Sequence, residues 1–121
     1  MEYQRCCPID PDSKQAWEKE LYEDWSYLEN INIHEVSQIF KVLNNHSRLK
    51  IAILLSKRDY CVCELVKILK EKNNSVSYNL NVLKEYQLVD SYYRSKDKYY
   101  KLDEKGIKLI RCLKHNLICE L

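Results

Sequence analysis

The chain has 121 residues, of which 45% are hydrophobic and 31% are charged, so its size and composition suit a single globular domain. It contains no apolar run of about 18 residues that could span a membrane. No apolar signal region follows the first residues, so we expect a cytoplasmic protein without a membrane partner. A single glycine in the whole sequence excludes glycine-rich phosphate loops. Because no acid–base or nucleophile constellation is present either, we expect no enzymatic activity and no organic cofactor.

Charge is distributed unevenly along the chain. Residues 1–35 contain nine acidic and three basic side chains, whereas residues 36–121 contain nine acidic and seventeen basic ones. This asymmetry indicates that the longer segment meets a polyanion such as DNA. A solvated surface of uneven charge is an equally open alternative at this stage.

The N-terminal part of the chain predicts an arm followed by a helix. Both prolines lie within residues 1–13, which show little periodicity, so we expect a flexible arm there and a folded domain over residues 14–121. A helix then follows to about residue 28, and either Asp12 or Ser13 can cap it. Its apolar stripe consists of Trp17, Leu21, Trp25 and Leu28.

The middle of the chain predicts a helix-turn-helix. Apolar periodicity indicates one helix over residues 36–43 and a second that begins near Ser47. Two further short helices, over residues 61–71 and 75–86, are separated by a turn of three or four residues, which is the spacing of a helix-turn-helix. The residues expected to cap these two helices are Asp59 for the first and Asn73 or Asn74 for the second.

The C-terminal part predicts a β-hairpin and a last helix. Residues 88–102 contain Val89 and four tyrosines, residue types that favour strands, and residues 94–98 form a basic tip. The tip lacks an Asn-Gly or Asp-Gly pair, so we expect a loop longer than two residues. Residues 103–120 return to helical spacing. The fold class is therefore mainly α with a β-hairpin wing, a winged helix-turn-helix.

The first and last helices predict assembly as well as fold. Each carries an apolar stripe, and a small domain has little else to cover both of them. We therefore expect a homodimer with twofold symmetry. The alternative is that both stripes close the core of a monomer.

Four stretches between residue 36 and about residue 102 match a family pattern: VSQIFKVLNNHSRLKIAILL, DYCVCEL, SVSYNLNVLKEYQLV and KYYKL. Over this range the chain resembles the ArsR/SmtB family of metal-sensing winged-helix repressors. The chain is most similar to the cadmium- and lead-responsive branch, whose members also carry cysteines in an N-terminal arm. This resemblance implies a repressor that binds double-stranded DNA and responds to a metal ion.

The expected DNA-reading surface combines the second helix of the helix-turn-helix with the wing. Small polar side chains on that helix suit base edges in the major groove, and flanking cations suit phosphates. The residues expected to read bases are Asn74, Ser75, Ser77, Tyr78 and Asn81. Those expected to contact the backbone are Lys84, Arg94, Lys96 and Lys98. A dimer would then read an inverted-repeat operator, with its two recognition helices ~34–36 Å apart.

The expected metal site is built on Cys61 and Cys63. Residues two apart on a regular helix point about 200° apart, so both can bind one ion only if Cys61 lies at the very start of the helix. Two thiolates do not complete a site, and Cys6 or Cys7 of the arm can supply the rest, from the same chain or from the partner. Thiolates select soft ions: Cd, Pb, Zn, or trivalent As, Sb or Bi. Simple apolar packing of the two cysteines is the alternative.

The sequence leaves open the role of the cysteines on the last helix and a redox alternative to metal sensing. Cys112, His115 and Cys119 share one helical face, either as a second site or, more simply, as packing residues of a dimer interface. The zinc-binding pattern of carboxylate and histidine that other family members carry on the last helix is absent here. The alternative function is a thiol redox switch on the same fold, in which oxidation of Cys61 and Cys63 releases DNA.

Overall fold

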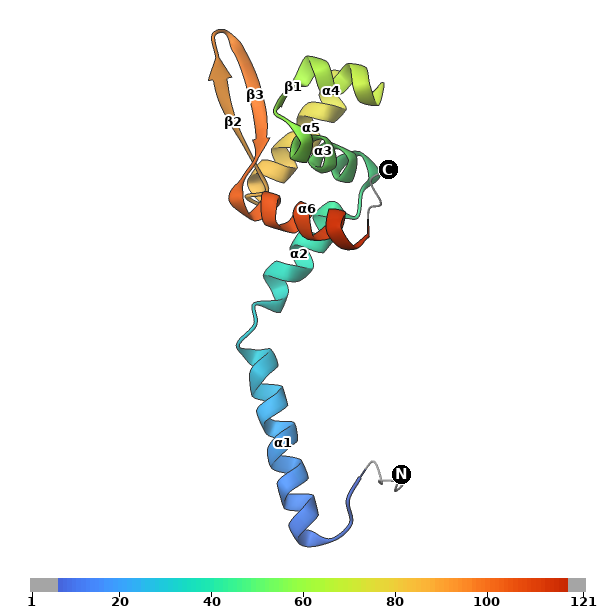
Figure 1. Ribbon diagram of the computed structural model, residues 1–121, viewed down its shortest axis with the longest axis vertical. Helices are drawn as coiled ribbons and strands as arrows, with labels where there is room; N and C mark the ends of the chain where they lie inside the picture. The colour runs from blue at the N-terminus through green and yellow to red at the C-terminus, as the bar shows by residue number, and fades with distance from the viewer. Residues whose placement is uncertain (1–6, 118–121) are drawn as a thin grey trace. The chain divides into compact units, whose positions relative to one another are not determined.

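The computed structural model describes residues 7–117. The chain forms two compact units, residues 1–37 and residues 38–121. The helices are α1 (Pro11–Glu29), α2 (Ile33–Leu43), α3 (His46–Lys57), α4 (Val62–Leu69), α5 (Asn73–Glu85) and α6 (Glu104–Asn116), and the strands are β1 (Tyr60–Cys61), β2 (Val89–Arg94) and β3 (Asp97–Leu102) (Figure 1). No helix within residues 7–117 is long and apolar enough to cross a membrane.

In the first unit, α1 begins earlier than the predicted caps require. Asp10 is the N-cap, and its carboxylate accepts a hydrogen bond from the Ser13 amide at 3.0 Å. The prediction of Asp12 or Ser13 as the cap is therefore wrong. Pro11 explains the shift, because proline is well suited to the first position of a helix. None of the residues of α1 is buried.

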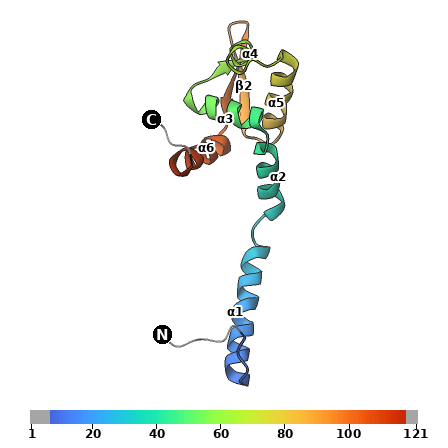
Figure 2. The ribbon, with the colours of Figure 1, turned by 90° about the vertical axis from the view of Figure 1, so that its right-hand side faces the viewer.

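The second unit is built around α3, which contacts α5, α6 and β3. Figure 2 shows α5 and α6 on opposite sides of α3. Fully buried side chains come from α3, α4, α5, α6 and the start of the wing, so these elements share one hydrophobic core. The largest of them are Ile51, Leu65, Leu80, Leu83, Leu88 and Ile110.

The helix-turn-helix consists of α4 and α5, which are linked by three residues as predicted. Lys70 takes the left-handed conformation at the end of α4, with a φ of 55°. A glycine usually occupies that position, and the sequence offers none there. The cap of α5 is Lys72, so the predicted caps Asn73 and Asn74 are wrong, and both residues lie within the first turn of the helix.

The wing is an antiparallel hairpin of β2 and β3, as predicted, but its turn is shorter than expected. Arg94 pairs with Asp97, so only Ser95 and Lys96 form the turn. The prediction of a longer loop is therefore wrong. Ser95 adopts a φ of 57°, which supplies the left-handed residue that a tight hairpin turn requires without a glycine.

A third strand, which the sequence did not indicate, joins the wing to the helix-turn-helix. The two residues of β1 pair with β3, Tyr60 with Tyr100 and Cys61 with Tyr99, so the strand order is β1-β3-β2. Two residues are too few to show an alternating pattern in sequence. Their pairing places the start of α4 directly beside the returning strand of the wing.

Candidate nucleic-acid interface and cysteine site

The outward face of α5 carries the residues predicted to read bases. Asn74, Ser75, Tyr78 and Asn81 are exposed, and Ser77 is half-buried, with its hydroxyl donating to Asn73 Oδ1 at 3.3 Å. The opposite face holds Val76, Leu80 and Leu83 in the core. Tyr78 is 65% exposed although it is a large aromatic residue, so its ring is available to a partner.

A polar contact beneath α5 fixes this helix to α3, and sequence reasoning missed it. Arg48 Nη1 donates to Asn79 Oδ1 at 3.1 Å, and Arg48 Nε donates to the Val42 carbonyl at 2.6 Å. Asn79 is the one buried polar residue among those the structure describes. Its place among exposed asparagines and serines hid its role, because only the fold shows which polar residue faces inward.

The turn between α4 and α5 is attached to α3 by a second polar contact. The Ser47 hydroxyl donates a short hydrogen bond to Glu71 Oε1. Together with the contact between Arg48 and Asn79, it holds the turn and the middle of α5 against one helix. The orientation of α5 is therefore set by side chains that do not reach its outward face.

The cations predicted to contact phosphates lie along the wing and at its base. Lys84 Nζ donates to Ser91 Oγ at 2.8 Å, so the end of α5 is bonded to β2. Arg94 stacks over the Tyr99 ring at 4.7 Å, and Lys98 lies 5.5 Å from the centre of the Tyr100 ring. Lys96 is exposed at the turn. These contacts orient the cationic side chains without pairing them to a carboxylate of residues 7–117.

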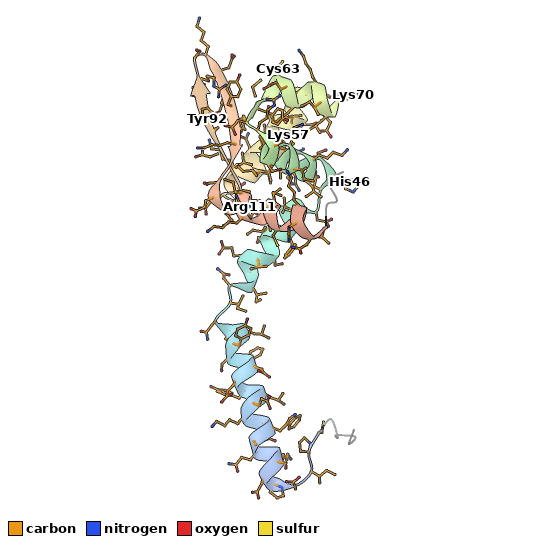
Figure 3. All side chains as sticks on the ribbon, in the orientation of Figure 1. His46, Lys57, Cys63, Lys70, Tyr92 and Arg111 are labelled. Atoms are coloured by element: carbon orange, nitrogen blue, oxygen red, sulfur yellow. The ribbon has the colours of Figure 1, made fainter. Side chains whose placement is uncertain are left out.

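Cys61 occupies the junction between wing and helix-turn-helix. It is the N-cap of α4, with an extended backbone (φ −89°, ψ 164°), and it also belongs to β1. Cys63 follows at the second position of α4 and is exposed (Figure 3). The two thiols are thus not both held in regular helical geometry, which is the condition that the sequence set for their binding one ion.

At the start of α4, the Glu64 side chain bonds to the amide of the N-cap residue Cys61, and the predicted cap Asp59 takes no part. Glu64 Oε1 accepts a hydrogen bond from the Cys61 amide at 3.1 Å, and Glu64 Oε2 forms an ion pair with Arg58 at 3.1 Å. These two donors lower the pKa of the Glu64 carboxyl below its ordinary value, so it is charged at neutral pH. The prediction of Asp59 as the cap is wrong: its carboxylate instead accepts a hydrogen bond from the Tyr92 hydroxyl.

The remaining thiols do not complete a metal site within the described residues. Over residues 7–117, no group of three or more histidine, cysteine, aspartate or glutamate side chains is arranged to hold a metal ion. Cys7 is exposed in the first unit, and Cys6 lies outside the described residues. On α6, Cys112 and His115 are exposed, and Cys119 again lies outside the described range. Cys61 and Cys63 therefore offer two ligands of an unfinished set.

A helix-turn-helix followed by a wing, with an exposed polar face on the second helix and cations on the wing, defines a winged-helix DNA-binding regulator. Comparison with known proteins gives the family. Residues 45–91 match the family described as "Bacterial regulatory protein, arsR family". The chain is 35% identical over 89 residues to the cadmium resistance transcriptional regulatory protein CadC of Listeria innocua, covering 73% of both chains. The chain therefore belongs to the ArsR family of bacterial regulatory proteins, as the sequence predicted.

Solved structures agree with this assignment. The transcriptional regulator HlyU from Vibrio vulnificus superimposes with a TM-score of 0.69 at 27% identity, covering 79% of this chain and 99% of that one. The transcriptional repressor BigR from Xylella fastidiosa gives a TM-score of 0.66 at 27% identity, covering 79% of this chain and 92% of its own. Both confirm the predicted winged-helix fold, and the family is one of transcriptional regulators rather than enzymes.

Proposed function

We propose that the protein is a repressor that binds operator DNA as a homodimer and is released when a soft metal ion binds cysteine thiolates. The observation that carries this proposal is the position of Cys61. One residue is both the N-cap of α4, the first helix of the DNA-reading unit, and the partner of Tyr99 in the wing. An ion bound there acts directly on both parts of the interface.

DNA recognition is assigned to the two surfaces described above. Asn74, Ser75, Ser77, Tyr78 and Asn81 read base edges, and Lys84, Arg94, Lys96 and Lys98 contact phosphates. This division is supported by the exposure of the polar face of α5 and by the aromatic contacts that orient the wing cations. Asparagine suits adenine in the major groove, and the Tyr78 ring suits a thymine methyl group.

Assembly as a homodimer is supported by exposed apolar side chains on the first helix. Leu21, Trp25 and Leu28 of α1 are 45%, 58% and 49% exposed, and they lie at helical spacing along one stripe. The last helix gives weaker support, because Ile110 is buried in the core of its own unit while Leu117 is 76% exposed. A twofold dimer presents two copies of α5 to DNA and so reads an inverted repeat.

The metal ligands are assigned to Cys61, Cys63 and an arm cysteine, Cys7 or Cys6, from the same chain or the partner. The donor set is the argument: two thiols lie at the start of α4, and a soft-metal site needs at least one more ligand. The relative from Listeria innocua is named for cadmium resistance, which supports a soft ion. Cd, Pb, Zn and trivalent As, Sb or Bi all fit thiolate ligands.

The direction of regulation follows from charge and position. An arm cysteine that joins the ion carries Asp10 and Asp12 with it, and both carboxylates oppose an approaching phosphate backbone. The ion also constrains the N-cap of α4, which the wing contacts through Cys61. Metal should therefore lower operator affinity, by a factor of about 5–150 for a typical allosteric coupling, and DNA should weaken metal binding by the same factor.

The experiment that tests this proposal measures operator affinity by fluorescence anisotropy with and without Cd(II). The variant Cys61→Ser/Cys63→Ser should bind DNA normally yet ignore the metal, whereas the matched control Cys112→Ser should respond like the wild type. Deletion of residues 1–12 should weaken Cd(II) binding, which is measured by the charge-transfer absorption of the thiolate–metal bonds. An undiminished metal response in the double variant would exclude this site, and tighter DNA binding with metal would reverse the proposed direction.

A redox switch is the second candidate, and one observation favours it. Two thiols two residues apart, without a third ligand nearby in the described chain, suffice for oxidation but do not complete a metal site. The discriminating measurement is operator release by a mild oxidant under chelating conditions, followed by recovery with a reductant. Release that needs metal and not oxidant favours the first proposal, and release by oxidant alone favours the second.

A further inference from the structure

A pocket on the second unit is not used by any part of the proposed function. It lies between the C-terminal end of α3, the end of β3 and α6, and its volume is about 550 Å³. Leu55 and Leu102, both buried in the core, and Ile107, which is 42% exposed, form its apolar surface. A volume of this size suits a small organic molecule.

The rim of this pocket is strongly basic. Among the described residues that line it, the cations are Lys57, Arg58, Lys101, Arg111 and Lys114, and Asp59 is the only acidic one. Some of these groups already have partners: Arg58 forms an ion pair with Glu64, Asp59 accepts a hydrogen bond from Tyr92, and Lys114 is also engaged. Cations therefore clearly outnumber carboxylates in the lining.

Two of the cationic side chains are available to bind a ligand. Lys57 on α3 and Arg111 on α6 are both exposed, and neither side chain forms a hydrogen bond or an ion pair in the part of the chain that the structure describes (Figure 3). Lys101 joins them from β3, where its ammonium group lies 5.8 Å from the centre of the Tyr92 ring. Like charges held around one cavity repel each other, and an anion between them relieves that repulsion.

The position of the pocket separates it from the recognition helix α5. Figure 2 shows α6 and α5 on opposite sides of α3, so the pocket does not adjoin the outward face of the recognition helix. Its apolar surface would also contribute little to binding a DNA backbone, because the charged phosphates stay hydrated. A small molecule that combines a phosphate with an apolar or aromatic body matches both halves of the lining.

We propose that this pocket binds a phosphorylated small molecule, with the phosphate held by Lys57, Lys101 and Arg111 and the body packed on Ile107 and Leu102. Arginine binds phosphate through two parallel hydrogen bonds, and lysine adds a compact charge, so a dianionic phosphate is favoured over a single carboxylate. The site shares no residue with the assigned cysteine ligands. The proposed phosphate site can therefore be tested independently of metal sensing.

The test is isothermal titration calorimetry of the full-length, metal-free protein with three probes: adenosine monophosphate, inorganic phosphate and adenosine. Adenosine monophosphate should bind saturably, inorganic phosphate more weakly, and adenosine weakest. The variant Lys57→Gln/Arg111→Gln should weaken binding of adenosine monophosphate by about tenfold or more, because it removes two charge-assisted contacts. The control Lys41→Gln/Lys50→Gln removes the same charge at exposed positions outside the pocket and should leave binding unchanged.

A second variant tests the apolar half of the site. Ile107→Ser should weaken adenosine monophosphate while leaving inorganic phosphate unaffected, because only the nucleotide reaches that side chain. Three results would overturn the proposal. The first is no saturable binding of either anion at millimolar concentration, and the second is that the Lys41/Lys50 control weakens binding of adenosine monophosphate as much as the Lys57/Arg111 variant does. The third is that the Lys57/Arg111 variant loses as much affinity for operator DNA as for adenosine monophosphate. The last result would assign these cations to DNA instead.

Discussion

The Tyr92 hydroxyl of the wing donates a hydrogen bond of 2.6 Å to the carboxylate of Asp59, which lies two residues before Cys61. The Tyr92 ring also stacks on Tyr99, with 6.0 Å between ring centres, and Tyr99 is the strand partner of Cys61. The wing therefore contacts the segment that leads to the cysteine pair through both a side chain and the backbone. A constraint at Cys61 has a short, continuous path to the wing.

The first prediction concerns this path. Tyr92→Phe removes the hydrogen bond to Asp59 and keeps the ring, so the variant should bind Cd(II) like the wild type. The decrease in operator affinity caused by the metal should be several-fold smaller in the variant than in the wild type. Tyr93→Phe is the matched control, because Tyr93 is 70% exposed and has no such bond. Anisotropy titrations with and without metal measure the difference. Equal metal responses in both variants would show that the coupling does not pass through Tyr92.

The same bond predicts a pH dependence. The hydrogen bond to Asp59 is the largest cause that raises the pKa of Tyr92 above its ordinary value of 10.0. A raised pKa means that the fold favours the protonated phenol, so the stabilisation is fully present below pH 10 and is lost as the pH rises through the folded-state pKa. The difference in free energy of unfolding between wild type and Tyr92→Phe should therefore be constant from pH 7 to pH 9. A difference that vanishes in that range would contradict the prediction.

The DNA surface predicts two distinct phenotypes. Ser77→Ala/Tyr78→Ala should abolish discrimination between operator and unrelated DNA while the protein stays folded, because the proposed function assigns these side chains to base edges. Lys96→Ala/Lys98→Ala should weaken binding to all sequences and reduce the salt slope by about one for each phosphate that is no longer neutralised. Both are measured by anisotropy over a range of salt concentrations. Altered sequence preference in the wing variant, with no change in the helix variant, would reverse the assignment.

The dimer prediction rests on α1. Trp25→Ala removes a large apolar side chain from the exposed stripe and should raise the dimer dissociation constant, observed by sedimentation velocity at micromolar concentration. Tyr27→Ala is the control, since Tyr27 is 69% exposed and points about 200° away from Trp25 around the helix. A stable wild-type monomer with full operator affinity would refute the dimer, and equal effects of both variants would place the interface elsewhere.

The single glycine predicts an unusual sign of mutational effect. Gly106 is buried in α6, where an added Cβ would lie 2.2 Å from the Leu88 carbonyl oxygen. Glycine to alanine normally stabilises a helix by about 1 kcal/mol, but here the backbone that leads into β2 would have to move. We expect Gly106→Ala to lower the free energy of unfolding by about 1–3 kcal/mol, measured by urea denaturation. An increase in that free energy would contradict the close approach of α6 to Leu88.

Local patterns in the sequence determined the order of the elements. Apolar residues at helical spacing identified the helices that the structure describes, and Val89 with the tyrosines that follow it identified the hairpin, because both signals come from residues close together in the chain. The cysteine pair and the polar face of α5 were identified for the same reason. The helix caps were less well predicted, since Asp59, Asn73 and Asn74 are all suitable caps by residue type and the choice depends on where each helix starts.

Contacts between distant residues were decided only by the tertiary structure. Arg48 and Asn79 are 31 positions apart, and Tyr92 and Asp59 are 33 apart. No spacing rule connects such residues, because their proximity results from packing α3 against α5 and the wing against β1. The two-residue strand β1 depends on the same packing, since it exists only where β3 supplies its partners. The sequence alone thus determined which chemical groups the protein carries, and the fold decided which of them meet, because burial and hydrogen bonding are settled by neighbours in space.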